Sequence, residues 1–100
     1  MKWLNLELIK NQLRIEQDFH DEDDALELYG ESSEETILMY VGRTYDEICE
    51  KYGSFPKSLV HASLMLVDIS YQNRSAVSPQ NMSVIPYGNI DTLVKPYMKL

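Results

Sequence analysis

The stretch from Pro56 to Val77 constrains the fold more than any other part of the sequence. Its residues recur at helical spacing in two adjacent rows: Val60, Leu64, Val67 and Tyr71, then Leu59, Ser63, Leu66 and Ser70. Such a wide band predicts a helix that is covered on most sides. Pro56 suits the first turn of that helix. The apolar run is too short, and too interrupted by Asp68, to span a bilayer. We therefore expect residues 56–77 to form the central helix of a small domain.

Two helices are expected before this one in the first 42 residues. Asn5 suits the cap of a short helix over about residues 6–13. A longer helix should run from about Asp24 to Val41, with Asp21 or Asp23 as its cap and Gly42 as the residue that ends it. The expected inward stripe of the longer helix is Leu26, Tyr29, Ser33, Ile37 and Tyr40. Its opposite face is acidic, which usually indicates a solvated surface.

A third short helix and a C-terminal helix complete the expected fold. Thr44 and Glu47 have the spacing of a capping box, and Gly53 suits the end of the helix that follows them. Residues 78–88 contain two prolines and a glycine, and they read as a long loop. Asn89 can cap a last short helix over residues 90–94. Residues 1–100 are thus predicted to form a single all-α domain, a small bundle of about four to five helices.

The charge of the chain excludes some partners. Sixteen acidic and nine basic side chains give a net charge of −7. A surface that acidic does not bind the DNA backbone by counterion release. It can mimic nucleic acid, keep a protein in solution, or line a passage to which DNA must not adhere. No apolar run at the N-terminus has the length of a signal peptide, so we expect the protein in the cytoplasm where it is made.

The acidic segment 16–24 invites a test for a calcium loop. Asp21 and Asp23 have the spacing that opens an EF-hand loop. However, no glycine stands at the sixth position, and Ser32 replaces the bidentate glutamate. We therefore favour helix capping by these aspartates over a metal site, and we expect no metal and no cofactor.

Catalytic patterns are missing from the sequence. No nucleophile with a base and no paired acid and base can be defended from spacing. Cys49 is the only cysteine, so it forms no intramolecular disulfide, and we expect a packed thiol. His20 and His61 have no ligand spacing, and the sequence assigns no role to them or to Cys49. We expect a protein that is not an enzyme.

The order of motifs resembles the head–tail connector, or adaptor, proteins of long-tailed bacteriophages, a family also labelled as DNA-packaging proteins. In the second half of the chain the motifs are Tyr71-Gln-Asn-Arg-Ser-Ala-Val77, Ile85-Pro-Tyr-Gly88, Leu93 and Pro96-Tyr97. In the first half they are Leu13-Arg14-Ile15, Asp23-Asp24 and Gly42-Arg43. The resemblance covers nearly the whole chain. The chain departs from the family pattern at Gly30-Glu31-Ser32 and in its short loop before Phe55-Pro56.

The resemblance implies an all-α structural protein of the virion and prophage. Members assemble into an oligomeric ring beneath the portal, which extends the DNA channel and joins head to tail in virion assembly and DNA packaging. The implied partners are further copies of the chain, the portal protein and the tail-completion proteins. DNA would pass through without specific binding, and no membrane is involved. The protein would occupy the host cytoplasm during assembly and then the head–tail junction of the virion.

Two groups of residues follow as site candidates. The expected interface with the neighbouring subunit or the portal consists of Asn73, Arg74, Val84, Ile85 and Tyr87, since an apolar loop segment needs cover. Arg74 can alternatively act as a local helix cap. The expected acidic, channel-facing residues are Asp21, Asp23, Glu27, Glu31 and Glu34.

Other classes of protein remain as alternatives. An acidic DNA-mimic inhibitor is compatible with the net charge, although the carboxylates cluster within residues 16–35. A small helical regulatory or interaction protein is the other alternative. A helix-turn-helix could be drawn from the third and central helices, but the central helix carries too few basic residues for phosphate contacts.

Overall fold

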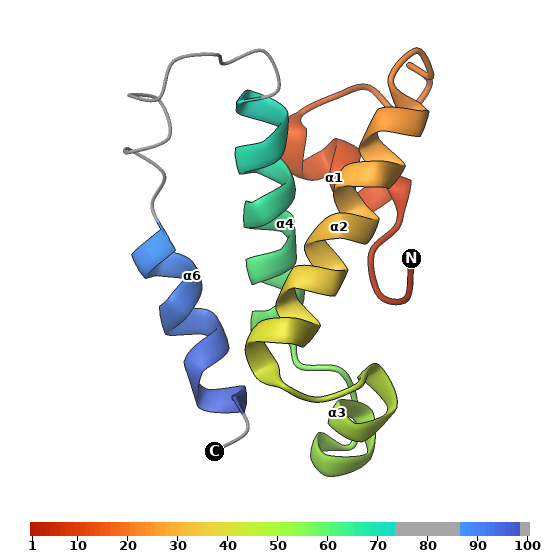
Figure 1. Ribbon diagram of the computed structural model, residues 1–100. Helices are drawn as coiled ribbons and strands as arrows, with labels where there is room; N and C mark the ends of the chain where they lie inside the picture. The colour runs from red at the N-terminus through yellow and green to blue at the C-terminus, as the bar shows by residue number, and fades with distance from the viewer. Residues whose placement is uncertain (74–86, 99–100) are drawn as a thin grey trace.

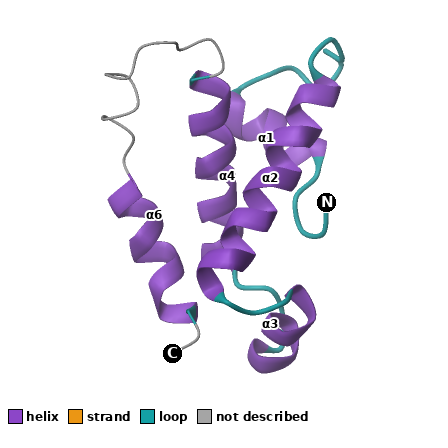
Figure 2. Cartoon of the chain, in the orientation of Figure 1, coloured by secondary structure: helices purple, strands orange, loops and turns teal. Residues whose placement is uncertain are grey.

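The computed structural model describes residues 1–73 and 87–98, and for residues 87–89 and 91 it describes the backbone alone. Every regular element in these ranges is helical (Figure 2). The elements are α1 (Leu6–Leu13), α2 (Asp23–Val41), α3 (Tyr45–Tyr52), α4 (Lys57–Gln72), α6 (Tyr87–Val94) and the 3₁₀ helix η1 (Lys95–Tyr97). The predicted all-α fold is confirmed.

Helix α4 is central, as its two apolar rows predict. It lies between α2 and α6 and also contacts α1, which lies behind it near one end (Figure 1). Helix α3 packs across the opposite end of the bundle, beyond the C-terminus of α2. The domain is a slab that measures 37 × 34 × 17 Å.

The core consists of two clusters that meet at α4. The larger one fills the space between α2, α3, α4 and α6 with Ile37, Val41, Ile48, Leu59, Ala62, Ile90 and Val94. The smaller one joins the N-terminal segment, α1, α2 and α4 through Leu4, Ile9, Leu26 and Val67. Because α4 contributes to both clusters, it buries residues on more than one side, which is the reason for its wide apolar band.

Local capping rules account for several helix ends. The Asn5 side chain accepts a hydrogen bond from the backbone N–H of Leu8 at 2.9 Å. Thr44 and Glu47 form the predicted capping box, with both hydrogen bonds at 3.2 Å. Gly42 and Gly53 adopt left-handed φ angles of 74° and 80° at the ends of α2 and α3. These features are confirmed as predicted.

The start of α2 differs from the expectation. Its N-cap is Glu22, which makes no side-chain capping bond, so the capping roles predicted for Asp21 and Asp23 are wrong. Asp23 is itself the first helical residue, and its carboxylate is engaged by Lys10 and His20 instead. The ion pair with a lysine from another helix replaces the local cap.

The predicted helix boundaries on either side of residues 74–86 also need correction. Helix α4 ends at Gln72, before the expected end at Val77, and Asn73 is its C-cap. Helix α6 begins at Tyr87, so Asn89 lies inside it rather than at its cap. Since proline is well tolerated immediately before or within a first helical turn, the helix can follow Pro86 directly in the sequence. Residues 74–86 lie outside the described residues.

Candidate functional site

Three large apolar side chains are exposed where the C-terminal end of α2 meets η1. Met39 is 83% exposed, Tyr40 45% and Met98 38%. The predicted stripe of α2 placed Tyr40 inward, and this part of the prediction is wrong. Leu26, Ser33 and Ile37 of the stripe are buried, whereas Tyr40 borders a hollow between α2 and the C-terminal segment and stays partly exposed. Such an exposed apolar group is typical of a contact surface.

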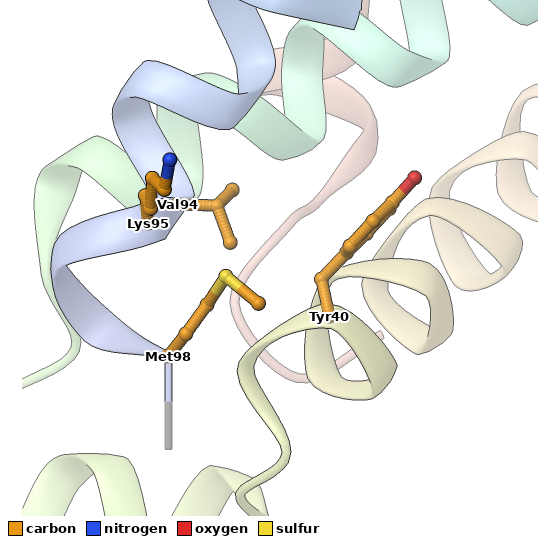
Figure 3. A pocket seen from close by; sticks show the side chains of 4 residues that line it. All are labelled: Tyr40, Val94, Lys95 and Met98. Atoms are coloured by element: carbon orange, nitrogen blue, oxygen red, sulfur yellow. The ribbon is translucent and has the colours of Figure 1, made fainter. Parts of the chain in front are cut away.

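A pocket of about 200 Å³ separates α2 from the C-terminal segment (Figure 3). Its lining consists of Tyr40, Val94, Lys95 and Met98. The Tyr40 ring forms one wall, and Val94 and Met98 point toward it from the other side. Val94 belongs to the core, whereas Lys95 is exposed at the rim. The pocket is therefore an apolar hollow with one cation at its edge.

Two shallower hollows lie beside Met39, and one of them shares Tyr40 with this pocket. One of about 370 Å³ is lined by Thr36, Met39 and Tyr40. The other, of about 450 Å³, is lined by Lys2, Leu38, Met39, Gly42, Arg43, Thr44, Tyr45 and Glu47. The Nε of Arg43 is buried there and has no hydrogen-bond partner among the described residues. This end of the domain thus combines exposed apolar groups with basic ones.

Glu34 is not on the acidic surface where the sequence places it. Its side chain is only 5% exposed. The carboxylate accepts hydrogen bonds from the backbone N–H groups of three consecutive residues: Lys2 at 2.8 and 3.0 Å, Trp3 at 2.9 Å and Leu4 at 2.9 Å. These donors compensate the cost of removing a charge from water. The expectation that Glu34 faces a channel is therefore corrected, because its carboxylate is used to hold the N-terminal segment.

Close packing accompanies this hydrogen-bonded segment at Gly30, one turn before Glu34. A Cβ atom added at Gly30 would overlap Met1 Sδ and would lie 2.9 Å from Ile9 Cδ1. The glycine therefore allows the N-terminal segment and α1 to approach the backbone of α2. This explains why α2 carries a glycine in its interior despite the cost to the helix.

Asp23 is also occupied inside the domain. Lys10, 1% exposed, places its Nζ 3.0 Å from Asp23 Oδ1 and donates to the carbonyls of Gln17 at 3.1 Å and Phe19 at 2.7 Å. His20 Nδ1 lies 2.9 Å from Asp23 Oδ2. The hydrogen bonds from Lys10 and then His20 lower the pKa of Asp23, against a smaller opposing effect of burial. Asp23 is therefore a partner of Lys10 in a cluster that fixes the turn between α1 and α2.

The other predicted site residues have separate positions. Asp21, Glu27 and Glu31 are exposed. Asn73 is half-buried, and its side-chain amide donates to the carbonyl of Ile69 at 2.9 Å, which is a local helix cap. Arg74, Val84 and Ile85 lie outside the described residues, and so does the side chain of Tyr87, whose backbone begins α6.

The surface around Met39, Tyr40 and Met98 was not predicted from the sequence. One sequence pattern indicates it in retrospect. Leu28 and Met39 both fall on the acidic face of α2, away from the buried stripe, and they are the two most exposed large apolar side chains in the described ranges. An apolar residue among glutamates was the sequence signal for an exposed contact residue. A search for hydrophobic periodicity passes over this signal because it identifies only the buried face of a helix.

The parts of the chain that the structure describes contain neither a candidate metal site nor a candidate membrane span. Across residues 1–73 and 87–98 there is no group of three or more His, Cys, Asp or Glu side chains that could hold a metal ion. Nor does any helix in those ranges have the length and apolarity to cross a bilayer. Cys49 is half-buried, and its hydrogen bond to Tyr45 is the main cause of a raised tyrosine pKa. His61 is exposed.

These features define a small all-α protein whose most distinctive surface is suited to contact with another protein. Comparison with family models then specifies the class: residues 4–93 match the family described as "Phage gp6-like head-tail connector protein". The chain belongs to this family of phage head–tail connectors, as the order of its motifs predicts. No match is found among curated proteins or solved structures.

Proposed function

We propose that the protein forms a ring beneath the portal of a long-tailed phage, where it extends the DNA channel and joins the head to the tail. The match to the connector family over residues 4–93 carries this proposal. The partners would be further copies of the chain, the portal protein and the tail-completion proteins. DNA would pass through the ring during packaging without being bound specifically. The role would be structural and would require no cofactor. The protein would be in the host cytoplasm during assembly and at the head–tail junction in the finished virion.

The exposed apolar groups support a role in assembly. Met39, Tyr40 and Met98 lie close together at one end of the slab, with Arg43 and Lys95 beside them. A small domain that leaves such groups in water gains free energy when another subunit covers them. Interfaces that join two different surfaces of identical subunits close into rings when the rotation between neighbours permits.

The exposed acids support a non-adhesive channel. Asp21, Glu27 and Glu31 would face the lumen, where their carboxylates repel the DNA phosphates. Glu34 is buried, and it leaves this group of candidates. The charge of Asp23 is paired with Lys10, so its contribution to the field in the channel would be small.

Residues 73–87 would supply a second contact, with the neighbouring subunit or the portal. Its candidates are Asn73, Arg74, Val84, Ile85 and Tyr87. The replacement Ile85→Asp would test it: the isolated chain should stay folded by circular dichroism, and co-sedimentation with the portal should be lost. If Ile85→Asp unfolds the isolated chain, the segment packs on its own core and the contact lies elsewhere.

The state of assembly tests the proposal as a whole. Native mass spectrometry and analytical ultracentrifugation should reveal a ring at high protein concentration or after addition of the cognate portal protein. A free protein that is monomeric on its own is compatible with templated assembly. A chain that stays monomeric under all conditions, with portal present, would contradict the ring.

A further inference from the structure

The strongest unassigned feature outside the pocket is Leu28, which protrudes from an acidic surface. Its side chain is 63% exposed, although it lies near the middle of a 19-residue helix. Asp24 and Glu31 lie one turn to either side of it on the same face of α2. Leu28 is thus an apolar projection with a carboxylate before and after it.

The pocket of Figure 3 has the complementary character. It is a hollow of about 200 Å³ with apolar walls from Tyr40, Val94 and Met98, and Lys95 stands at its rim. Lys95 makes no ion pair with any residue in the described ranges. A leucine side chain has the size and apolarity to enter this hollow, and the carboxylates beside Leu28 match the free cation at the edge.

The two features cannot meet within one chain. Leu28 and Tyr40 belong to the same continuous helix and are separated by more than three turns, roughly 18 Å along the axis. A contact between the projection and the pocket therefore requires two copies. Because the two surfaces differ, each copy can use one surface toward each of two neighbours, so that the contact repeats around the proposed ring.

We infer that Leu28 of one subunit docks in the pocket formed by Tyr40, Val94 and Met98 of the next, with Lys95 paired to Asp24 or Glu31 beside the docked leucine. This inference rests on the proposed ring and specifies its subunit contact. In this arrangement Glu31 lies at the subunit boundary, and Asp21 and Glu27 remain the candidates for the channel.

Cysteine cross-linking of mixed chains tests the contact directly. Two variants are made in a Cys49→Ser background, one with Leu28→Cys and one with Met98→Cys. Under assembly conditions with cognate portal, a disulfide dimer should form when the two variants are mixed and not when either is oxidised alone. Cross-linking of the Leu28→Cys variant with itself would reveal a symmetric contact and would overturn the inference. Exclusive cross-linking of the Met98→Cys variant to the portal would assign the pocket to another partner, with the same consequence.

Matched substitutions at two exposed apolar positions give an independent readout. Leu28→Ser and Phe19→Ser both remove a large exposed apolar side chain, but only Leu28 belongs to the inferred contact. Leu28→Ser should weaken subunit association by about tenfold or more, whereas Phe19→Ser should leave it largely unchanged. Circular dichroism should show both variants folded. Equal weakening by the two variants would contradict the specific docking of Leu28.

Charge reversal tests the polar part of the contact. Lys95→Glu should weaken association, and the combination with Asp24→Lys and Glu31→Lys should restore it. If the wild-type chain assembles and none of these variants changes its assembly, the ring stands and the docking inference fails. If the wild-type chain never assembles, even with portal, the proposed function fails together with the inference that depends on it.

Discussion

Two regions of the domain break the usual distribution of residues in opposite ways. Beside the N-terminal segment and α1, charged groups are buried: Lys10 is 1% exposed and Glu34 5%. At the C-terminal end of α2, apolar Met39 is 83% exposed. The buried charges are compensated inside the chain, because each has several hydrogen-bonding partners at short distance. Met39 has no such compensation. The first region therefore serves the stability of the single domain, whereas the second is available for contact with another chain.

The largest expected effect lies at Glu34. Glu34→Ala leaves three backbone N–H groups without their acceptor, and the free energy of unfolding should fall by about 3 kcal/mol. Urea denaturation followed by circular dichroism measures this change. The control is Glu35→Ala at the exposed neighbouring position, which should alter stability by no more than about 0.5 kcal/mol. If the two substitutions lowered the free energy of unfolding equally, the hydrogen bonds of Glu34 would contribute no more to stability than an exposed carboxylate does.

The buried lysine should have the next largest effect. Lys10→Met keeps the aliphatic stem but removes the donor to two carbonyls and the partner of Asp23, which should cost about 2 kcal/mol. The matched control is Lys57→Met at the exposed start of α4. Chemical denaturation of both variants measures the free energy of unfolding. A Lys10→Met variant as stable as the control would show that the ammonium group contributes no net stability.

The ion pair between Lys10 and Asp23 should make the stability of the domain depend on pH. Its pKa in the folded state lies below the ordinary value of 3.8, so folding favours the ionised form. The stabilisation is complete at pH values above the unfolded pKa and disappears as the pH falls through the lowered folded pKa. Asp23→Asn should therefore be less stable than the wild type at pH 7, with a difference that narrows below pH of about 4. Thermal melts across this range measure it, and a difference independent of pH would contradict this account.

The smallest effect is expected at the exposed apolar end. Met39→Ser should change the free energy of unfolding of the isolated domain by no more than about 0.5 kcal/mol, because the side chain is already in water. Denaturation at a concentration where the protein is monomeric makes the measurement. A loss above about 1 kcal/mol would show that Met39 packs within its own chain, and the contrast between the two regions would disappear.

Local rules explain which parts of the fold could be predicted from sequence. Asn5, Thr44 and Gly42 act within a few residues of their own positions, so their capping roles follow from spacing alone. The role of Glu34 could not be predicted in this way. Its donors lie some 30 residues away, and the pattern around it is that of an ordinary solvated face. Burial of a charge depends on a tertiary contact that periodicity does not contain.

In the candidate site, too, features that depend on local sequence could be predicted, and features that depend on tertiary contacts could not. An acidic surface could be predicted from composition. The sequence did not indicate which of its carboxylates form ion pairs, because the pairing of Asp23 depends on its tertiary contact with Lys10 of α1. The pocket between Tyr40 and Met98 requires two elements that are distant in sequence. The pocket can be recognised as a candidate contact surface only from the tertiary structure, in which α6 packs beside α4 and α2.

The attachment of the N-terminal segment has a consequence for how the chain reaches its native state. Trp3 is the only tryptophan; its indole N–H donates to Ser63 Oγ at 3.0 Å, and its ring stacks on Phe55 at 4.2 Å. During synthesis Trp3 is made before both partners, and Ser63 on α4 follows 60 residues later, a delay of several seconds at about 5–20 residues per second. The segment must therefore dock after much of the chain has emerged. Since the fluorophore is unique, its emission during refolding follows that docking step without any added label.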